Sequence, residues 1–340
     1  MSGWIRFSKP PRLISAASVV GKREFEGPLG DLFDMHDGST GFFDGADRFG
    51  QPTWEQSEAE MQRLAFNLAV SKLGASEDAI GALFAGDLIN QCTGSAYGLL
   101  NYNIPFFGLY GACSTAAEGL ILSAMTVAAG YFDRAAAVTS SHNCSAERQF
   151  RFPLEYGGQR TPTSQWTVTG SGAFVIGTEP VPGSPEIVSC CIGITREKGI
   201  TDINNMGAAM APAAVDTLQR YFTESGTAPS DYDLIVTGDL GYEGHGIVLD
   251  MMKADGYDLS ANYNDCGLLI YHRSGQDMHA GGSGCGCSAV VLAAYLLKQM
   301  REGKLRNLLF IGTGALMSPM TVQQGLPIPG VAHLLHLRMP

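Results

Sequence analysis

The chain has 340 residues, of which 45% are hydrophobic and 16% charged, and its formal net charge is -11 at pH 7. This composition excludes a disordered chain and is typical of a compact protein with a sizeable core. No Lys/Arg-rich run offsets the negative charge, so nucleic acid is excluded as a partner and direct adsorption to an anionic membrane is disfavoured.

The N-terminus and the cysteines bear on where the protein works. Residues 1–11 lack the hydrophobic region of a secretory signal, and no stretch offers the roughly 18 apolar residues of a membrane span. We therefore expect an intracellular protein that reaches a membrane only through partners. The eight irregularly spaced cysteines are expected to be reduced, and Cys285 and Cys287 are too closely spaced for a zinc site.

The first half of the chain alternates predicted strands and helices. Strands are expected over residues 11–20, 80–88, 134–141 and 170–177. Thr53 is predicted to cap a helix with this buried stripe: Met61, Leu64, Ala65, Leu68 and Leu73. Residues 24–53 are predicted to form a long loop, in which these side chains are better explained as turn residues than as metal ligands: Asp34, His36, Asp37 and Asp44.

Residues 108–120 are the most distinctive part of this half. A strand-like approach ends in small residues and Cys113, after which a helix with one apolar face is predicted. A thiol at such a turn lies near unpaired backbone N–H groups and the positive end of a helix dipole, which stabilise a thiolate or a bound anion. The position therefore suits an acyl-transfer nucleophile and a small-anion site equally well. Packing of a small buried cysteine is the third interpretation.

The same plan recurs after a connection rich in proline. Strands are predicted over residues 187–195, 233–240 and 305–313, and helices over 206–223 and 288–301. Asp239 repeats the position of Asp87, and extra residues lie around 245–272. Two copies of a strand–helix unit imply two pseudo-repeated α/β halves, residues 1–180 and 181–340, with largely parallel sheets around buried helices.

These residues carry a resemblance to known proteins. The duplicated halves and the run Gly111-Ala112-Cys113-Ser114-Thr115-Ala116 resemble the thiolase and ketoacyl-synthase superfamily. Nearly the whole chain is similar to the stage V sporulation protein AD family, through residues 110–115, 138–143, 152–157, 165–170, 238–241, 281–288 and 312–329. The resemblance implies a thiolase-like α/β fold layered α-β-α-β-α. In the superfamily, the cysteine at the position of Cys113 accepts the acyl group.

The resemblance also implies a function. It points to binding of dipicolinic acid (pyridine-2,6-dicarboxylic acid) in support of its uptake into the developing spore. The expected partners are membrane proteins of the same sporulation operon, which would hold the protein at the inner forespore membrane. A homodimer paired across a sheet edge is expected by analogy. No cofactor and no metal site are predicted.

The condensing machinery of the superfamily is incomplete in this sequence. Asp239 stands where ketoacyl synthases have a histidine, and a carboxylate there would repel a developing oxyanion. His245 would reach inward only if its loop folds back, and His279 matches the second family histidine loosely. We therefore predict binding without chemistry, with a cysteine-dependent acyltransferase or condensing enzyme as the alternative.

A planar dicarboxylate needs N–H or cationic donors and a flat wall. The predicted ligand-binding residues are Cys113, His142, Arg160, Asp239, His245, His279, Gly282 and Ser283. Further candidates are Arg148 and Arg151 as donors and Phe150, Tyr156 and Trp166 as the wall. Asp239 would hold calcium if that ion accompanies the ligand. For Asp239 and His279, a structural role in a turn is the competing interpretation.

Overall fold

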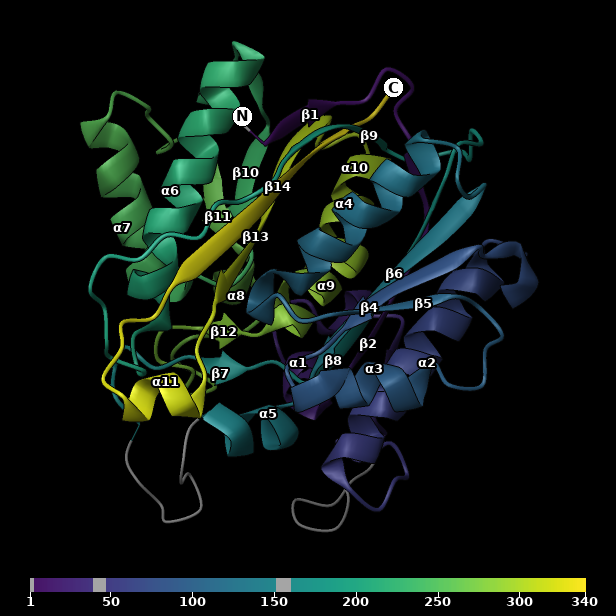
Figure 1. Ribbon diagram of the computed structural model, residues 1–340, viewed down its shortest axis with the longest axis horizontal. Helices are drawn as coiled ribbons and strands as arrows, with labels where there is room; N and C mark the ends of the chain where they lie inside the picture. Colours follow the sequence, from purple (N-terminus) through teal and green to yellow (C-terminus); the bar gives the residue numbers. More distant parts are fainter. Residues whose placement is uncertain (1–2, 39–46, 151–159) are drawn as a thin grey trace.

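The computed structural model describes residues 3–38, 47–150 and 160–340. Its main sheet has 12 strands in the order β11-β10-β13-β14-β9-β2-β8-β6-β4-β5, with β1 added to β9 and β3 to β2. The sheet divides into two parts, each built mainly from one half of the sequence (Figure 1).

The first part of the sheet comes mainly from the first half of the chain. Its strands are β2 (Arg12–Val20), β3 (Met35–His36), β4 (Ala82–Gly86), β5 (Phe106–Leu109), β6 (Arg134–Ser141) and β8 (Gly170–Gly177). β4 is parallel to β5 and β6, whereas β8 runs antiparallel to β2 and β6. The four longer predicted strands of this half are thus confirmed.

The second part is built from β1 (Trp4–Arg6), β9 (Glu186–Cys191), β10 (Leu234–Thr237), β11 (Tyr263–Asp265), β13 (Asn307–Ala315) and β14 (Gly330–Arg338). The two parts meet where Arg12 of β2 pairs with Glu186 of β9, and the same residues form an ion pair with an N–O distance of 2.9 Å. β1 pairs with β9, so the start of the chain lies in the sheet of the second half. The division at residue 180 stays a prediction.

Helices lie between and outside these two parts (Figure 1). α4 (Thr115–Ala128) contacts β4 and β6 as well as β13 and β14, and α9 (Cys285–Val291) lies beside it. α9 continues through a π-helical turn, η7 (Leu292–Leu296), into α10 (Leu297–Arg301). Packing against a sheet on both sides explains why α4 and α9 consist mainly of small and apolar residues and are almost uncharged.

The outer layers complete the predicted order α-β-α-β-α, which is confirmed. α2 (Trp54–Lys72) covers the first part of the sheet, and α6 (Met206–Ser225) with α7 (Gly241–Ala254) covers the second. α7 covers residues 245–254 of the stretch that the sequence marks as extra, and it is longer than α3 (Thr93–Gly98). The remaining short elements are α1 (Lys22–Phe25), η1 (Gly30–Leu32), η2 (Glu77–Ala79), η3 (Asn90–Cys92), η4 (Ala112–Ser114), α5 (Asn143–Phe150), β7 (Trp166–Thr167), η6 (Pro229–Asp231), α8 (Cys266–Leu269), β12 (Gly282–Ser283) and α11 (Pro319–Gln323).

Two details of the first half differ from the prediction. Thr53 caps α2 as expected, but Leu64 and Leu68 are only half-buried, and the helix buries Phe66 and Ala69 beside Met61 and Ala65. The buried face is rotated because Glu58 and Gln62 also point inward, where they bond to serines of the first half: Ser95, Ser140 and Ser145.

The predicted loop over residues 24–53 contains short regular elements, among them η1 and β3. Asp34 bonds to Ser18 and Lys72, which agrees with a structural role, whereas Asp44 lies outside the described residues. No group of three possible metal ligands occurs within residues 3–38, 47–150 and 160–340. None of the helices that the structure describes is long and apolar enough to cross a membrane.

Candidate functional site

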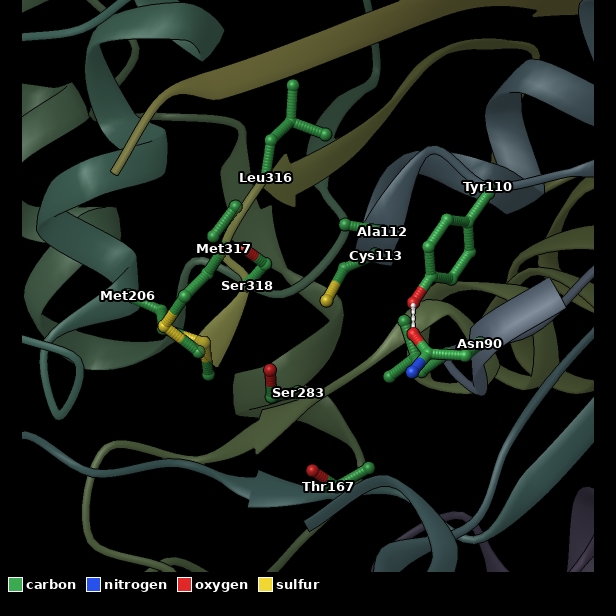
Figure 2. Close-up of a pocket in the computed structure, with 12 residues that line it drawn as sticks. Asn90, Tyr110, Ala112, Cys113, Thr167, Met206, Ser283, Leu316, Met317 and Ser318 are labelled. Atoms are coloured by element: carbon green, nitrogen blue, oxygen red, sulfur yellow. Dashed lines mark hydrogen bonds between the residues drawn. The ribbon is translucent and has the colours of Figure 1, made fainter. Parts of the chain in front are cut away.

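A cavity of about 270 Å³ lies where the two halves meet, beside the start of α4. Figure 2 shows the Cys113 side chain pointing into its centre. The apolar wall comes mainly from the second half and consists of Leu88, Ala112, Met206, Ala315, Leu316 and Met317. A cavity of this size, with a mostly apolar lining and a few polar groups, has the character of a small-molecule site.

The polar lining of the cavity is uncharged. It consists of Asn90, Tyr110, Thr167, Ser283 and Ser318. The Tyr110 hydroxyl donates to Asn90 Oδ1 over 3.1 Å, which fixes both side chains at one side of the cavity (Figure 2). None of the described residues that line the cavity is Lys, Arg or His. A ligand therefore meets hydroxyl and amide groups here rather than positive charge.

The backbone before Cys113 explains the orientation of its side chain. Ala112 has a φ of +52°, a left-handed conformation that L-residues adopt at a cost. The turn is closed by the Ser114 hydroxyl on the Gly111 carbonyl at 2.7 Å and by the Thr115 hydroxyl on the Ala112 carbonyl at 2.7 Å. This tight turn holds Cys113 at the base of the cavity, where its side chain is 7% exposed.

Asp239 lies behind Cys113 and is fully buried. Its carboxylate accepts hydrogen bonds from the Thr313 hydroxyl at 2.8 Å, the Ser283 hydroxyl at 3.0 Å and the Gly284 backbone N–H at 2.8 Å. The Cys113 thiol is a further hydrogen-bond partner. Protein donors thus satisfy the carboxylate, and Asp239 positions Cys113 and Ser283 without lining the cavity itself.

The electrostatic surroundings of Cys113, with Asp239 beside it, disfavour the thiolate form of its side chain. Burial raises the pKa of Cys113 well above its usual value, and the charge of Asp239 and the hydrogen bond to it raise it further. Burial also raises the pKa of Asp239 above its ordinary value, although its hydrogen bonds act in the opposite direction. Cys113 is therefore held as a neutral thiol that is hydrogen-bonded to Asp239. A nucleophile needs the thiolate instead.

A second buried aspartate stabilises the loop that carries Asp239. Asp265 accepts hydrogen bonds from the Thr237 hydroxyl and from the backbone N–H groups of Leu240, Gly241 and Gly267, at 2.7 to 3.0 Å. Burial raises its pKa to about 7. No sequence motif marks Asp265, because its partners come together only when β10, β11 and α8 pack.

Two of the predicted ligand-binding histidines lie away from the cavity. His142 is buried; its Nδ1 accepts the Cys144 N–H at 3.1 Å, and its Nε2 faces the Asp47 carbonyl at 2.8 Å. Burial lowers the pKa of His142, so both ring nitrogens of the neutral form are used within the fold. His245 lies on α7 and stacks on Tyr263, with ring centroids 4.5 Å apart. Their roles as ligands stay predictions that the cavity does not support.

Among the other predicted ligand-binding residues, Ser283 lines the same cavity as Cys113, whereas Arg160, His279 and Gly282 do not line it. Arg160 and His279 meet at Asp277, which lines a separate recess. Gly282 is buried, and a Cβ added there would meet Ile270 at 2.8 Å, which explains the glycine by close packing. Trp166 lines neither cavity, and the predicted Arg151 and Tyr156 lie outside the described residues.

Comparisons with known proteins agree with this architecture. The family model described as Stage V sporulation protein AD (SpoVAD) matches residues 2–338. The chain is 45% identical over 335 residues to "Stage V sporulation protein AD" of Bacillus subtilis strain 168, covering 97% of this chain and 94% of the relative.

Solved structures show similarity at the level of the fold. A 3-oxoacyl-[acyl-carrier-protein] synthase III from Aquifex aeolicus superposes with a TM-score of 0.58 at 12% identity, covering 97% of this chain and 100% of that chain. An OleA variant from Xanthomonas campestris, crystallised with bound lauric acid and lauroyl-CoA, gives a TM-score of 0.60 at 14% identity, with 97% and 99% of the two chains covered. The predicted thiolase-like fold is thus confirmed, and by its sequence the chain belongs to the stage V sporulation protein AD family.

Proposed function

We propose that the Cys113 cavity binds dipicolinic acid, or its calcium chelate, without chemistry, in support of its uptake into the developing spore. The observation that carries this proposal is the thiol of Cys113, which lies at the base of a small cavity and is hydrogen-bonded to buried Asp239. A thiol in this state contributes a polarizable surface to a binding site rather than a nucleophile.

The size and the charge of the cavity support a small, charge-compensated ligand. A volume of about 270 Å³ suits a single aromatic ring with two carboxyl groups better than an acyl chain on a pantetheine arm. The described lining offers hydroxyl and amide groups but no cation. Transferring a free dianion into such a site is costly, whereas calcium would neutralise the two carboxylates of the ligand. We therefore expect the chelate to be the form that this cavity prefers.

Filling the cavity is expected to weaken binding of the calcium chelate strongly. Met317 lines the cavity, whereas Met320, one turn away on α11, is 65% exposed. Met317→Trp should weaken binding by about tenfold or more because the indole occupies the ligand's space, and Met320→Trp serves as the matched control. Isothermal titration of the full chain with calcium dipicolinate measures both. No saturable binding by the wild type, or equal binding by Met317→Trp, contradicts the proposal.

A cysteine-dependent acyltransferase is the second candidate function. It is favoured by the strained turn that places Cys113 at the start of α4, and by the synthase fold of the solved neighbours. This candidate requires a thioester on Cys113 after incubation with acyl-CoA, which mass spectrometry of the intact chain detects. An adduct that is absent in Cys113→Ala would replace the binding proposal by this one.

We further propose that the protein works beside membrane proteins of the same sporulation operon, which hold it at the inner forespore membrane. Support comes from family membership alone. Fractionation of sporulating cells measures this: the protein should sediment with the membrane and become soluble when those partners are deleted.

The exposed edge of the sheet supports a homodimer. β5 pairs with β4 on one side, and its Phe106 and Phe107 are 41% and 53% exposed. An edge strand with large apolar side chains is suited to pairing with a second copy. Phe107→Lys should convert a dimer to a monomer in size-exclusion chromatography with light scattering, whereas Tyr131→Lys, at another exposed aromatic residue, should not. A monomeric wild type would refute this proposal.

A further inference from the structure

Cationic side chains gather on the far side of the small sheet formed by β7 and β12. These strands are parallel, with Trp166 opposite Gly282 and Thr167 opposite Ser283. Because side chains alternate along a strand, Thr167 and Ser283 face the Cys113 cavity, and Trp166 faces away from it. The guanidinium carbon of Arg23 lies 4.3 Å from the Trp166 ring centroid and that of Arg160 lies 5.1 Å from it.

Arg160 carries a hydrogen-bonding group that lacks an acceptor. Its side chain is 14% exposed, and Nη2 donates to Asp277 Oδ2 at 3.0 Å. Nη1 is buried and has no hydrogen-bond partner within the part of the chain that the structure describes. A buried guanidinium edge without an acceptor is costly, so this atom indicates a place for a further anionic group.

A solvent-open recess of about 510 Å³ adjoins this cluster and is lined by Pro162, Arg273, Ser274, Asp277 and His279. Arg273 is fixed at its rim: Nε donates to the His279 carbonyl at 2.6 Å, and the guanidinium carbon lies 3.7 Å from the Tyr242 ring centroid. Asp277 and His279 have φ values of +55° and +51°, so the loop is held in a conformation that L-residues rarely adopt. The arrangement presents a guanidinium that is already oriented.

The charges of the cluster do not balance. Arg160 forms an ion pair with Asp277, whereas Arg23 lies over the Trp166 ring. Arg273 lines the recess beside Asp277 and is a third positive charge. Asp277 is 79% exposed and is shared between Arg160 and His279. A local excess of positive charge, in a chain whose net charge is -11, attracts anions to this surface.

We propose that this recess is a second ligand site, which binds a small dianion through carboxylate or phosphate groups. Arg273, which lines the recess, would supply the charged donor, because a guanidinium is well suited to bind such oxyanions. Arg160 lies next to the recess through its ion pair with Asp277 and adds to the positive charge there. The site shares no lining residue with the Cys113 cavity. A free dicarboxylate thus has a charged site on one face of β7 and β12, while the uncharged cavity lies on the other. The proposal rests on the proposed function in one respect, namely that the Cys113 cavity takes the calcium chelate and not the free dianion.

Titration of the full chain at low ionic strength, with a chelator present to remove calcium, tests this site. The ligand is dipicolinate dianion in one arm and inorganic phosphate in the other, so that binding of a carboxylate is distinguished from binding of a phosphate. Saturable binding by the wild type in either arm is expected. It should be weakened by about tenfold or more in Arg273→Gln, because glutamine cannot make the charge-assisted hydrogen bonds of the guanidinium. Added salt should weaken it further.

Controls separate this site from the Cys113 cavity and from general charge effects. Arg301→Gln, at an exposed arginine at the end of α10, and Met317→Trp, in the other cavity, should both leave dianion binding unchanged. Arg273 is exposed, so its replacement leaves no buried group unpaired, and thermal unfolding checks the fold of each variant. Absence of saturable binding in both arms, or equal binding by Arg273→Gln, overturns the proposal. Loss of binding in Met317→Trp overturns it as well, because it would place the dianion at Cys113.

Discussion

The stability of the fold is expected to fall as the pH rises from about 6 to about 8, and Glu24→Gln is expected to remove part of that fall. Glu24 is 1% exposed; burial, and then the charge of Asp47, raise its pKa from 4.5 to about 8. Its Oε1 accepts the Thr169 N–H at 3.0 Å and the Tyr271 hydroxyl. The folded chain therefore keeps this carboxyl protonated at pH values where the unfolded chain ionises it.

The sign of the effect follows from proton linkage. The folded state binds more protons than the unfolded state between pH 4.5 and about 8, so stability is greatest below this window and is lost as the pH rises through it. Glu58, with a pKa raised to about 8, and Asp265, raised to about 7, act in the same direction. For Glu24 alone the loss between pH 6 and 8 is on the order of 2 kcal/mol.

Urea unfolding at both pH values measures the effect. A glutamine at position 24 resembles the protonated acid, so Glu24→Gln should be less sensitive to pH than the wild type and relatively more stable at the higher pH. Glu26→Gln, at an exposed neighbour, is the matched control and should keep the wild-type slope. A wild type whose stability rises over this interval would show that Glu24 is ionised in the folded state.

Replacing Asp239 is expected to have the largest effect on the cavity. Asp239→Ala leaves the Ser283 and Thr313 hydroxyls and the Gly284 N–H without their acceptor, which should destabilise the fold by on the order of 3 kcal/mol. Asp239→Asn keeps one carbonyl acceptor and should cost about 1 kcal/mol. Comparing the two variants by urea unfolding separates the loss of hydrogen bonds from the loss of charge.

The asparagine variant should also lower the pKa of Cys113. The Asp239 charge and its hydrogen bond both raise this pKa, so removing the charge moves it toward the ordinary value, while burial still acts. The alkylation rate of the Cys113 peptide by iodoacetamide, followed by mass spectrometry, should rise in Asp239→Asn. Asp255→Asn, at an exposed carboxylate after α7, should alkylate like the wild type. Equal rates in all three proteins would mean that Asp239 does not suppress the thiolate.

The sequence predicted the elements better than the faces they bury. The cap at Thr53 depends on neighbouring residues and was predictable, as were the strands that became β2, β6 and β8. The buried stripe of α2 was partly wrong because Glu58 and Gln62 are drawn inward by serines that lie far along the chain. A hydrophobic pattern cannot register such polar contacts, since it assigns charged residues to the solvent.

The residues of the candidate site also divide into those that the sequence predicted and those that it did not. Cys113 and Ser283 line the cavity with Asp239 behind them. Cys113 and Ser283 lie just before the helices α4 and α9, and Asp239 lies just after the strand β10. Asn90 and Met317, which also shape the cavity, lie in segments with no periodic signal, and Met206 opens a predicted helix whose pattern does not mark it as a cavity residue. Arg160 and His279 were predicted for the same ligand, and the structure joins them at Asp277, away from the Cys113 cavity. They lie in loops before β7 and before β12, whose paths no sequence motif marks.

The pairing of β1 with β9 has a consequence for synthesis. During translation, Trp4, Ile5 and Arg6 leave the ribosome long before their hydrogen-bond partners in residues 189–191. The first half can form its own strands in that interval, but this leading segment has no place to dock. A nascent chain stalled before residue 186 should therefore expose its beginning to proteases, and release of the remaining residues should protect it.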